Sequence, residues 1–183
     1  MRSTCLLFLL MGCASTAANI YKPVPQNGPS PQSIRWRQCA LPAWIILDDG
    51  LSTFEPAVVA AIKEWNDTTG IKLFVYGGVS DVDNEDLPAP FFTITQNDLG
   101  NDCGHTKLYG HEGNLCIWSA KIEFSNNCFD SFSNIIKHEL GHLLGLADVG
   151  DVEYNGIMYY HVRQASFISK EEASIVRSFY LDK

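Results

Sequence analysis

The sequence predicts an α+β domain in which a twisted mixed sheet is accompanied by three helices. Short β-prone segments alternate along the chain with segments of helical apolar period, and this alternation favours α+β or α/β architectures. The 183 residues are 46% hydrophobic and 19% charged, a composition typical of one globular domain with a short appendage. We therefore expect one folded domain over residues 34–183, preceded by two short N-terminal segments.

The first of these segments, residues 1–13, is typical of a signal peptide. It contains one basic residue and a short apolar core, and it ends in Leu10-Met11-Gly12-Cys13. This ending resembles a bacterial lipobox, in which the cysteine becomes the lipidated N-terminus. Cleavage after Ala17 is the alternative. We expect an exported protein anchored to a membrane surface through a lipid on Cys13, or a secreted or periplasmic protein if the lipid is absent.

The second segment, residues 14–33, is rich in proline and polar residues and lacks an apolar period. It predicts an extended tether. The formal net charge of the chain is −8, which argues against an extended nucleic-acid footprint, because such a footprint needs a surplus of basic side chains. No apolar run has the roughly 18 to 20 residues that a membrane span requires.

Local sequence patterns predict the secondary structure of the domain. The predicted strands cover residues 42–47, 71–76, 91–95 and 115–124, and the predicted helices cover residues 55–68, 131–146 and 170–180. Ser52 or Thr53 is the expected N-cap of the first helix, and Gly70 is expected to end it. One face of this helix is apolar and should be buried: Val58, Ala61, Ile62 and Trp65.

The cysteines favour disulfides over a structural zinc cluster. Four of the six remain after the signal peptide: Cys39, Cys103, Cys116 and Cys128. An even number in an exported chain predicts two disulfides, and sequence alone does not choose among the three connectivities. A structural zinc cluster is disfavoured because no Cys-x-x-Cys spacing is present.

The second predicted helix contains His138-Glu139-Leu140-Gly141-His142. Histidines four residues apart lie on one helical face, so both imidazoles can reach the same cation, and the glutamate between them lies beside the open position of the metal. The pattern predicts a zinc site with its own general base. Two solvated histidines on a surface helix are the alternative.

A catalytic zinc ion needs a third protein ligand and an open fourth position. Gly145 can adopt the left-handed conformation that ends a helix and returns the chain toward the metal, which makes Asp148 a candidate third ligand. Competing side chains are His105, His111, His161 and Asp151, together with Glu171 or Glu172 if the ligand comes from a later helix as in gluzincins.

The full pattern, His-Glu-x-x-His-x-x-Gly-x-x-Asp, resembles the metzincin metallopeptidases, whose usual third ligand is histidine. The aspartate variant is similar to the small bacterial snapalysin-type endopeptidases. Gly156-Ile157-Met158-Tyr159-Tyr160 resembles the methionine turn of that clan, and residues 61–71 and 168–180 are similar to the first and closing helices of matrixin-type domains. The resemblance covers residue 34 to the C-terminus and implies an active-site helix followed by a small C-terminal subdomain. Its spacing favours Asp148 over the competing ligands.

The resemblance also implies roles. Glu139 would take a proton from a zinc-activated water and pass it to the leaving amine, with His138, His142 and Asp148 as zinc ligands. Tyr160 matches the position of a tyrosine that stabilises the oxyanion in astacin- and serralysin-like relatives; a packed aromatic is the alternative. Met158 is expected to form a hydrophobic floor beneath the site.

The resemblance implies that an extended substrate pairs with an edge strand, here placed at residues 115–124. The acidic residues 81–86 could hold Ca²⁺, with a solvated loop as the alternative. Cys39 is similar in context to the cysteine switch of matrixins, but the rest of that motif is absent, so the means of latency stays open.

The sequence thus predicts a monomeric, exported zinc endopeptidase that cleaves proteins or peptides. The alternative from another class is a zinc-stabilised binding or adhesion module without turnover. Glu139 argues against this alternative, because a structural zinc site has no use for a general base.

Overall fold

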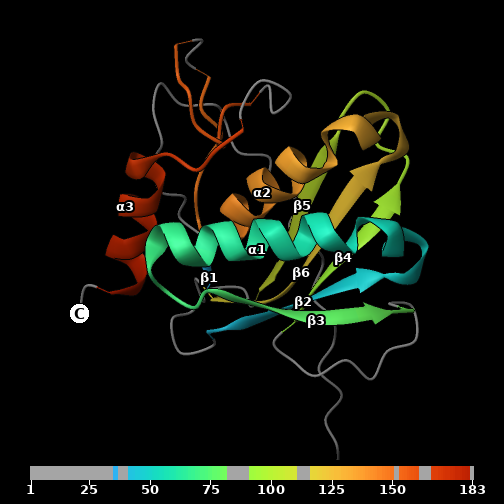
Figure 1. Ribbon diagram of the computed structural model, residues 1–183, viewed down its shortest axis with the longest axis horizontal. Coiled ribbons are helices and arrows are strands. Elements are labelled where there is room, and N and C mark those ends of the chain that lie inside the picture. Colours follow the sequence, from blue (N-terminus) through green and yellow to red (C-terminus); the bar gives the residue numbers. More distant parts are fainter. Residues whose placement is uncertain are drawn as a thin grey trace, which may run out of the picture.

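A computed structural model describes residues 35–36, 41–81, 91–110, 116–150, 153–160 and 166–181. Its strands form one mixed six-stranded sheet (Figure 1). They are β1 (Arg35–Trp36), β2 (Ala43–Asp48), β3 (Phe74–Ser80), β4 (Phe91–Asn97), β5 (Gly104–Gly110) and β6 (Cys116–Ser125). Strands β3, β2, β4 and β6 are neighbours in that order and parallel, while β5 pairs with β6 antiparallel and the short β1 pairs with the start of β6.

Three α-helices accompany the sheet within the described residues: α1 (Glu55–Thr69), α2 (Phe132–Leu143) and α3 (Lys170–Tyr180). Helices α1 and α2 lie along the same face of the sheet, and α3 lies beside one end of α1 (Figure 1). The predicted α+β class with a mixed sheet is therefore confirmed. None of these helices has the length and apolar character needed to cross a membrane.

The core lies between this face of the sheet and the helices. The residues of β2, β4 and β6 that belong to the hydrophobic core alternate along each strand, as the period of a strand requires. Those on the helix side are Ala43, Ile45, Leu47, Phe92, Ile94, Ala120, Ile122 and Phe124. The predicted stripe of α1 meets them, because Val58, Ala61, Ile62 and Trp65 are all buried.

The first helix differs from prediction at its start. Neither Ser52 nor Thr53 caps it, because a 3₁₀ segment, Asp49–Phe54, leads directly into α1. Its end is as predicted, with Gly70 left-handed at φ 70°. The following strand begins at Phe74 rather than residue 71, because the side chain of Asn66 binds the backbone of Leu73 and Phe74 and holds the intervening turn.

The prediction that residues 115–124 form an edge strand was wrong. Residues 116–125 form β6, which pairs with β4 on one side and β5 on another, so it lies inside the sheet. The edge next to α2 is β5, a strand that was not predicted from the sequence. The sequence held one signal for this strand, a short alternation in which Thr106 and Leu108 are separated and flanked by polar residues.

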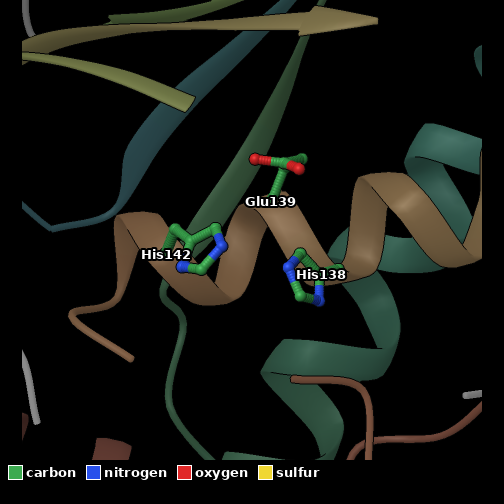
Figure 2. Close-up of side chains that lie close together, drawn as sticks. All are labelled: His138, Glu139 and His142. Carbon is green, nitrogen blue, oxygen red and sulfur yellow. The ribbon is translucent and has the colours of Figure 1, made fainter. Parts of the chain in front are cut away.

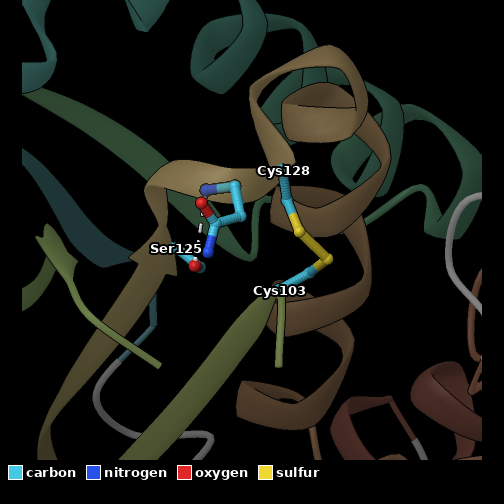
Figure 3. Close-up of a disulfide and its surroundings, with 4 residues drawn as sticks. Cys103, Ser125 and Cys128 are labelled. Carbon is cyan, nitrogen blue, oxygen red and sulfur yellow. Dashed lines mark hydrogen bonds between the residues drawn. A yellow bond between two sulfur atoms is a disulfide. The ribbon is translucent and has the colours of Figure 1, made fainter. Parts of the chain in front are cut away.

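One disulfide, Cys103–Cys128, joins the start of β5 to the segment that leads into α2 (Figure 3). Cys39 and the side chain of Cys116 lie outside the described part, so the second of the two predicted disulfides stays a prediction. The signal peptide, the tether and the acidic residues 82–86 also lie outside it.

Candidate metal centre

The two motif histidines lie one turn apart on α2, and both side chains are buried. Their ring centroids are 4.7 Å apart and the rings are nearly perpendicular, at 89°. Both imidazoles lie on the same side of the helix (Figure 2). Together with Glu139 they form a group whose ligand atoms all lie within 4.8 Å of one another, so these residues could hold a metal ion.

Backbone carbonyls orient both rings. Nδ1 of His138 lies 2.8 Å from the carbonyl oxygen of Ile157, and Nδ1 of His142 lies 2.9 Å from that of Leu146. A carbonyl oxygen only accepts hydrogen bonds, so each Nδ1 carries the hydrogen in a neutral ring and Nε2 keeps its lone pair. This is the arrangement that metal-binding histidines commonly have.

The end of α2 brings Asp148 back to the histidines. Gly145 is left-handed at φ 92°, as the sequence predicts, and the amides of Gly145 and Leu146 bind the carbonyls of His142 and Gly141. These two bonds form a Schellman motif, which satisfies the last carbonyls of the helix and reverses the chain. Oδ1 of Asp148 then lies 2.9 Å from Nε2 of His138 and 3.4 Å from Nε2 of His142.

These distances fit the ligand set of a zinc ion. Ligand atoms at about 2.0–2.1 Å from a tetrahedral ion lie about 3.3 Å from one another, close to the two values observed here. Two imidazoles and one carboxylate are ligands that zinc commonly takes in catalytic sites. The donor set and its spacing therefore fit zinc.

Without a metal, His142 and Asp148 form a largely buried ion pair. Burial by itself would lower the pKa of His142, but its hydrogen bond to Asp148 and the nearby carboxylate of Glu139 outweigh burial and raise that pKa to about 9. Burial would raise the pKa of Asp148, yet the hydrogen bonds to both histidines hold it below its ordinary value. Metal binding at this site must therefore displace a proton.

The segment predicted to be a methionine turn lies directly under α2. Met158 is fully buried, and a Cβ atom at Gly141 would collide with its sulfur atom, so glycine is what allows the two to pack so closely. The amide of Met158 binds Oε1 of Glu172 at 2.7 Å, and the amide of Ile157 binds Oε2 at 3.3 Å. Glu172, fully buried at the start of α3, thus anchors the turn whose Ile157 carbonyl orients His138.

Glu139 points from α2 toward the strands rather than along the histidines (Figure 2). Its Oε2 atom accepts a hydrogen bond from the hydroxyl of Thr106 on β5 at 2.6 Å. Both side chains are buried. The sequence alone did not point to Thr106, because its contact with Glu139 joins residues 33 positions apart and depends on a strand that was not predicted.

The remaining candidates lie elsewhere or outside the described residues. His105 follows the strand alternation onto the face of β5 opposite to Thr106, and Glu172 is engaged with backbone amides. Glu171 is exposed on α3. His111, Asp151 and His161 lie outside the described part. Tyr160 is 43% exposed and its ring packs edge-on against Tyr159, so its role in stabilising an oxyanion stays a prediction.

Comparisons with known proteins leave the family open. No protein-family model matches the chain, and no curated protein matches it. Among solved structures, the chain is similar to one described as the GM1 bound form of the ECX AB5 holotoxin, with 13% sequence identity and a TM-score of 0.49. The match covers 87% of this chain and 86% of that one. No conclusion about this chain rests on a likeness this distant.

Proposed function

We propose that this chain is a zinc-dependent endopeptidase of metzincin type that hydrolyses peptide bonds in proteins. The observation that carries the proposal is the convergence of the Nε2 atoms of His138 and His142 on one carboxylate oxygen of Asp148. Both imidazoles are already oriented by backbone carbonyls, and a glutamate lies beside them. A site with three ligands and an adjacent carboxylate is arranged for hydrolysis rather than for structure alone.

Each residue then has a defined task. His138, His142 and Asp148 would hold the ion, which when bound would act as a Lewis acid on the scissile carbonyl and lower the pKa of a water molecule toward neutrality. Glu139 accepts the proton of the attacking water and delivers it to the nitrogen of the leaving amine. Tyr160 is the candidate donor to the oxyanion.

The decisive experiment is cleavage of an unstructured protein such as casein by the zinc-loaded full chain. We expect activity that a chelator abolishes and zinc restores, and that Glu139→Ala lowers by about 100-fold to 10,000-fold, the range for loss of a general base. Glu171→Ala, an exposed glutamate on α3, is the matched control and should stay active. Equal rates for the wild type and Glu139→Ala would refute the mechanism.

Zinc content tests the ligands separately. Asp148→Ala should abolish zinc binding and activity together, and a zinc-loaded, fully active Asp148→Ala protein would overturn the assignment. If the wild type and Glu139→Ala both bind zinc and neither cleaves, the zinc-stabilised binding module becomes the better description.

We further propose that the protein acts as a monomer on the outer side of a membrane, held there by a lipid on Cys13. The disulfide between Cys103 and Cys128 supports export, because such bonds persist in oxidising compartments. Replacement of Cys13 by serine should move the protein from the membrane fraction to the soluble fraction. A Cys13→Ser protein that stays with the membrane would contradict the lipid anchor.

A further inference from the structure

The edge strand β5 carries two adaptations to Glu139. The first is the hydroxyl of Thr106, whose oxygen lies 2.6 Å from Oε2 of Glu139 and 3.4 Å from the carbonyl oxygen of the same residue. An ionised carboxylate only accepts hydrogen bonds, so the hydroxyl must donate. The short distance is typical of a charge-assisted O–H···O⁻ bond, which makes the carboxylate the preferred acceptor over the more distant carbonyl.

The second adaptation is Gly104, two residues earlier on the same face of the strand. A Cβ atom there would collide with Oε1 of Glu139 and would lie 2.7 Å from the Cγ2 atom of Ile135. The backbone conformation at Gly104 does not require glycine, since its φ is not positive. The missing side chain is therefore needed for space, and Oε1 packs directly over the strand.

The two contacts act on different oxygens of one carboxylate. A glutamate side chain has three rotatable bonds, and fixing it in one orientation costs conformational entropy unless a contact offsets that cost. Thr106 supplies the contact at Oε2, and Gly104 leaves the space for Oε1. In this orientation a carboxylate oxygen of Glu139 stays within 4.8 Å of a ring nitrogen of each histidine.

We infer that Thr106 is a positioning residue for the general base, and that β5 therefore serves the chemistry as well as the sheet. The inference rests on the proposed function and deepens it, because it names what holds Glu139 in place. Thr106 acts through Glu139 alone. Its removal should therefore change turnover without changing zinc binding.

The test compares two replacements in the zinc-loaded full chain. Thr106→Val keeps the shape of the side chain and removes the hydroxyl, whereas Thr106→Ser keeps the hydroxyl. We expect Thr106→Val to lower kcat by about 10-fold to 100-fold with KM nearly unchanged, because small misplacements of a catalytic group have effects of this size. Thr106→Ser should recover most of the loss.

A matched control is available on β4. Thr95 is also buried, and its hydroxyl has no hydrogen-bond partner among the described residues, so Thr95→Val removes a buried hydroxyl without touching Glu139. We expect this variant to retain kcat. Zinc affinity, measured by competition with a chromogenic chelator, should be the same for the wild type and all three variants.

Three results would overturn the inference: an unchanged kcat in Thr106→Val, a loss in Thr106→Ser as large as that in Thr106→Val, or a fall in zinc affinity that accounts for the lost activity. Crystal structures supply a readout that does not depend on turnover. Glu139 should leave β5 in Thr106→Val and keep its place in the wild type. If the wild type itself shows no Glu139-dependent cleavage, the proposed function fails, and these structures alone decide whether Thr106 holds the carboxylate.

Discussion

Replacing Glu172 by glutamine tests how the turn beneath the histidines is held. The Glu172 carboxylate is fully buried and accepts three backbone N–H groups: Met158 at 2.7 Å on Oε1, and Ser169 at 2.6 Å and Ile157 at 3.3 Å on Oε2. Glutamine has the same shape but only one oxygen. Its NH₂ group cannot accept a hydrogen bond, so at least one buried amide loses its partner.

The expected loss of stability in Glu172→Gln follows from these contacts. The amide group would keep its oxygen at the Oε2 position, where it serves two donors, and would turn its NH₂ group toward the amide of Met158. A hydrogen bond to a charged group contributes about 1.5–3 kcal/mol, and the two remaining bonds weaken when the charge is removed. We therefore expect Glu172→Gln to lower the free energy of unfolding by about 2–4 kcal/mol. For a domain of this size the melting temperature should fall by about 5 to 15 °C.

The assay is urea and thermal unfolding in the presence of a chelator, so that bound metal does not contribute. Glu171→Gln is the matched control, because it makes the same change of charge at an exposed position in the first turn of α3 and should cost less than about 1 kcal/mol. Zinc affinity of Glu172→Gln should also fall about 10-fold, because the anchored turn orients His138. Equal unfolding free energies for the two variants would refute the reasoning.

Three other changes have defined outcomes. Gly145→Ala should lower the free energy of unfolding by about 1–2 kcal/mol, because φ 92° is unfavourable for alanine; an unchanged urea midpoint would contradict this. Gly141→Ala should cost about 1–3 kcal/mol through collision with Met158, and adding Met158→Ala should relieve part of the strain in a double-mutant cycle; strict additivity would argue against the contact. Replacing Cys103 and Cys128 by serine opens a bridge across 25 positions and should cost about 3 kcal/mol, measured by urea unfolding without reductant; a loss under 1 kcal/mol would show that the bridge constrains little.

Much of the candidate site could be predicted from sequence because it is local. His138 and His142 are four residues apart on one helix, and the period of the helix alone places them on one face. Gly145 reverses the chain directly after that helix, so Asp148 has a short path back to the histidines. The helix α3 has the predicted bounds, residues 170–180, and in the structure Ser169 and Glu172 form a capping box at its start, which is also a local feature.

Interactions between distant segments could not be predicted in the same way. The edge of the sheet was wrongly predicted at residues 115–124. Strand pairing depends on partners elsewhere in the chain, and β5, the actual edge strand, has only a weak sequence pattern of its own. The contact of Thr106 with Glu139 needs both the strand and its register. Glu172 was considered as a competing ligand, whereas its contacts show that it holds the backbone of the turn.

The sequence by itself determined which residues form the candidate zinc site, because helical period, a left-handed glycine and short spacing are local properties. Only the tertiary structure decided what supports them. The carbonyl of Ile157 orients His138, Glu172 anchors that turn, and Thr106 holds Glu139. Each of these contacts joins segments that are distant along the chain, and their geometry exists only once the sheet and the helices have packed together.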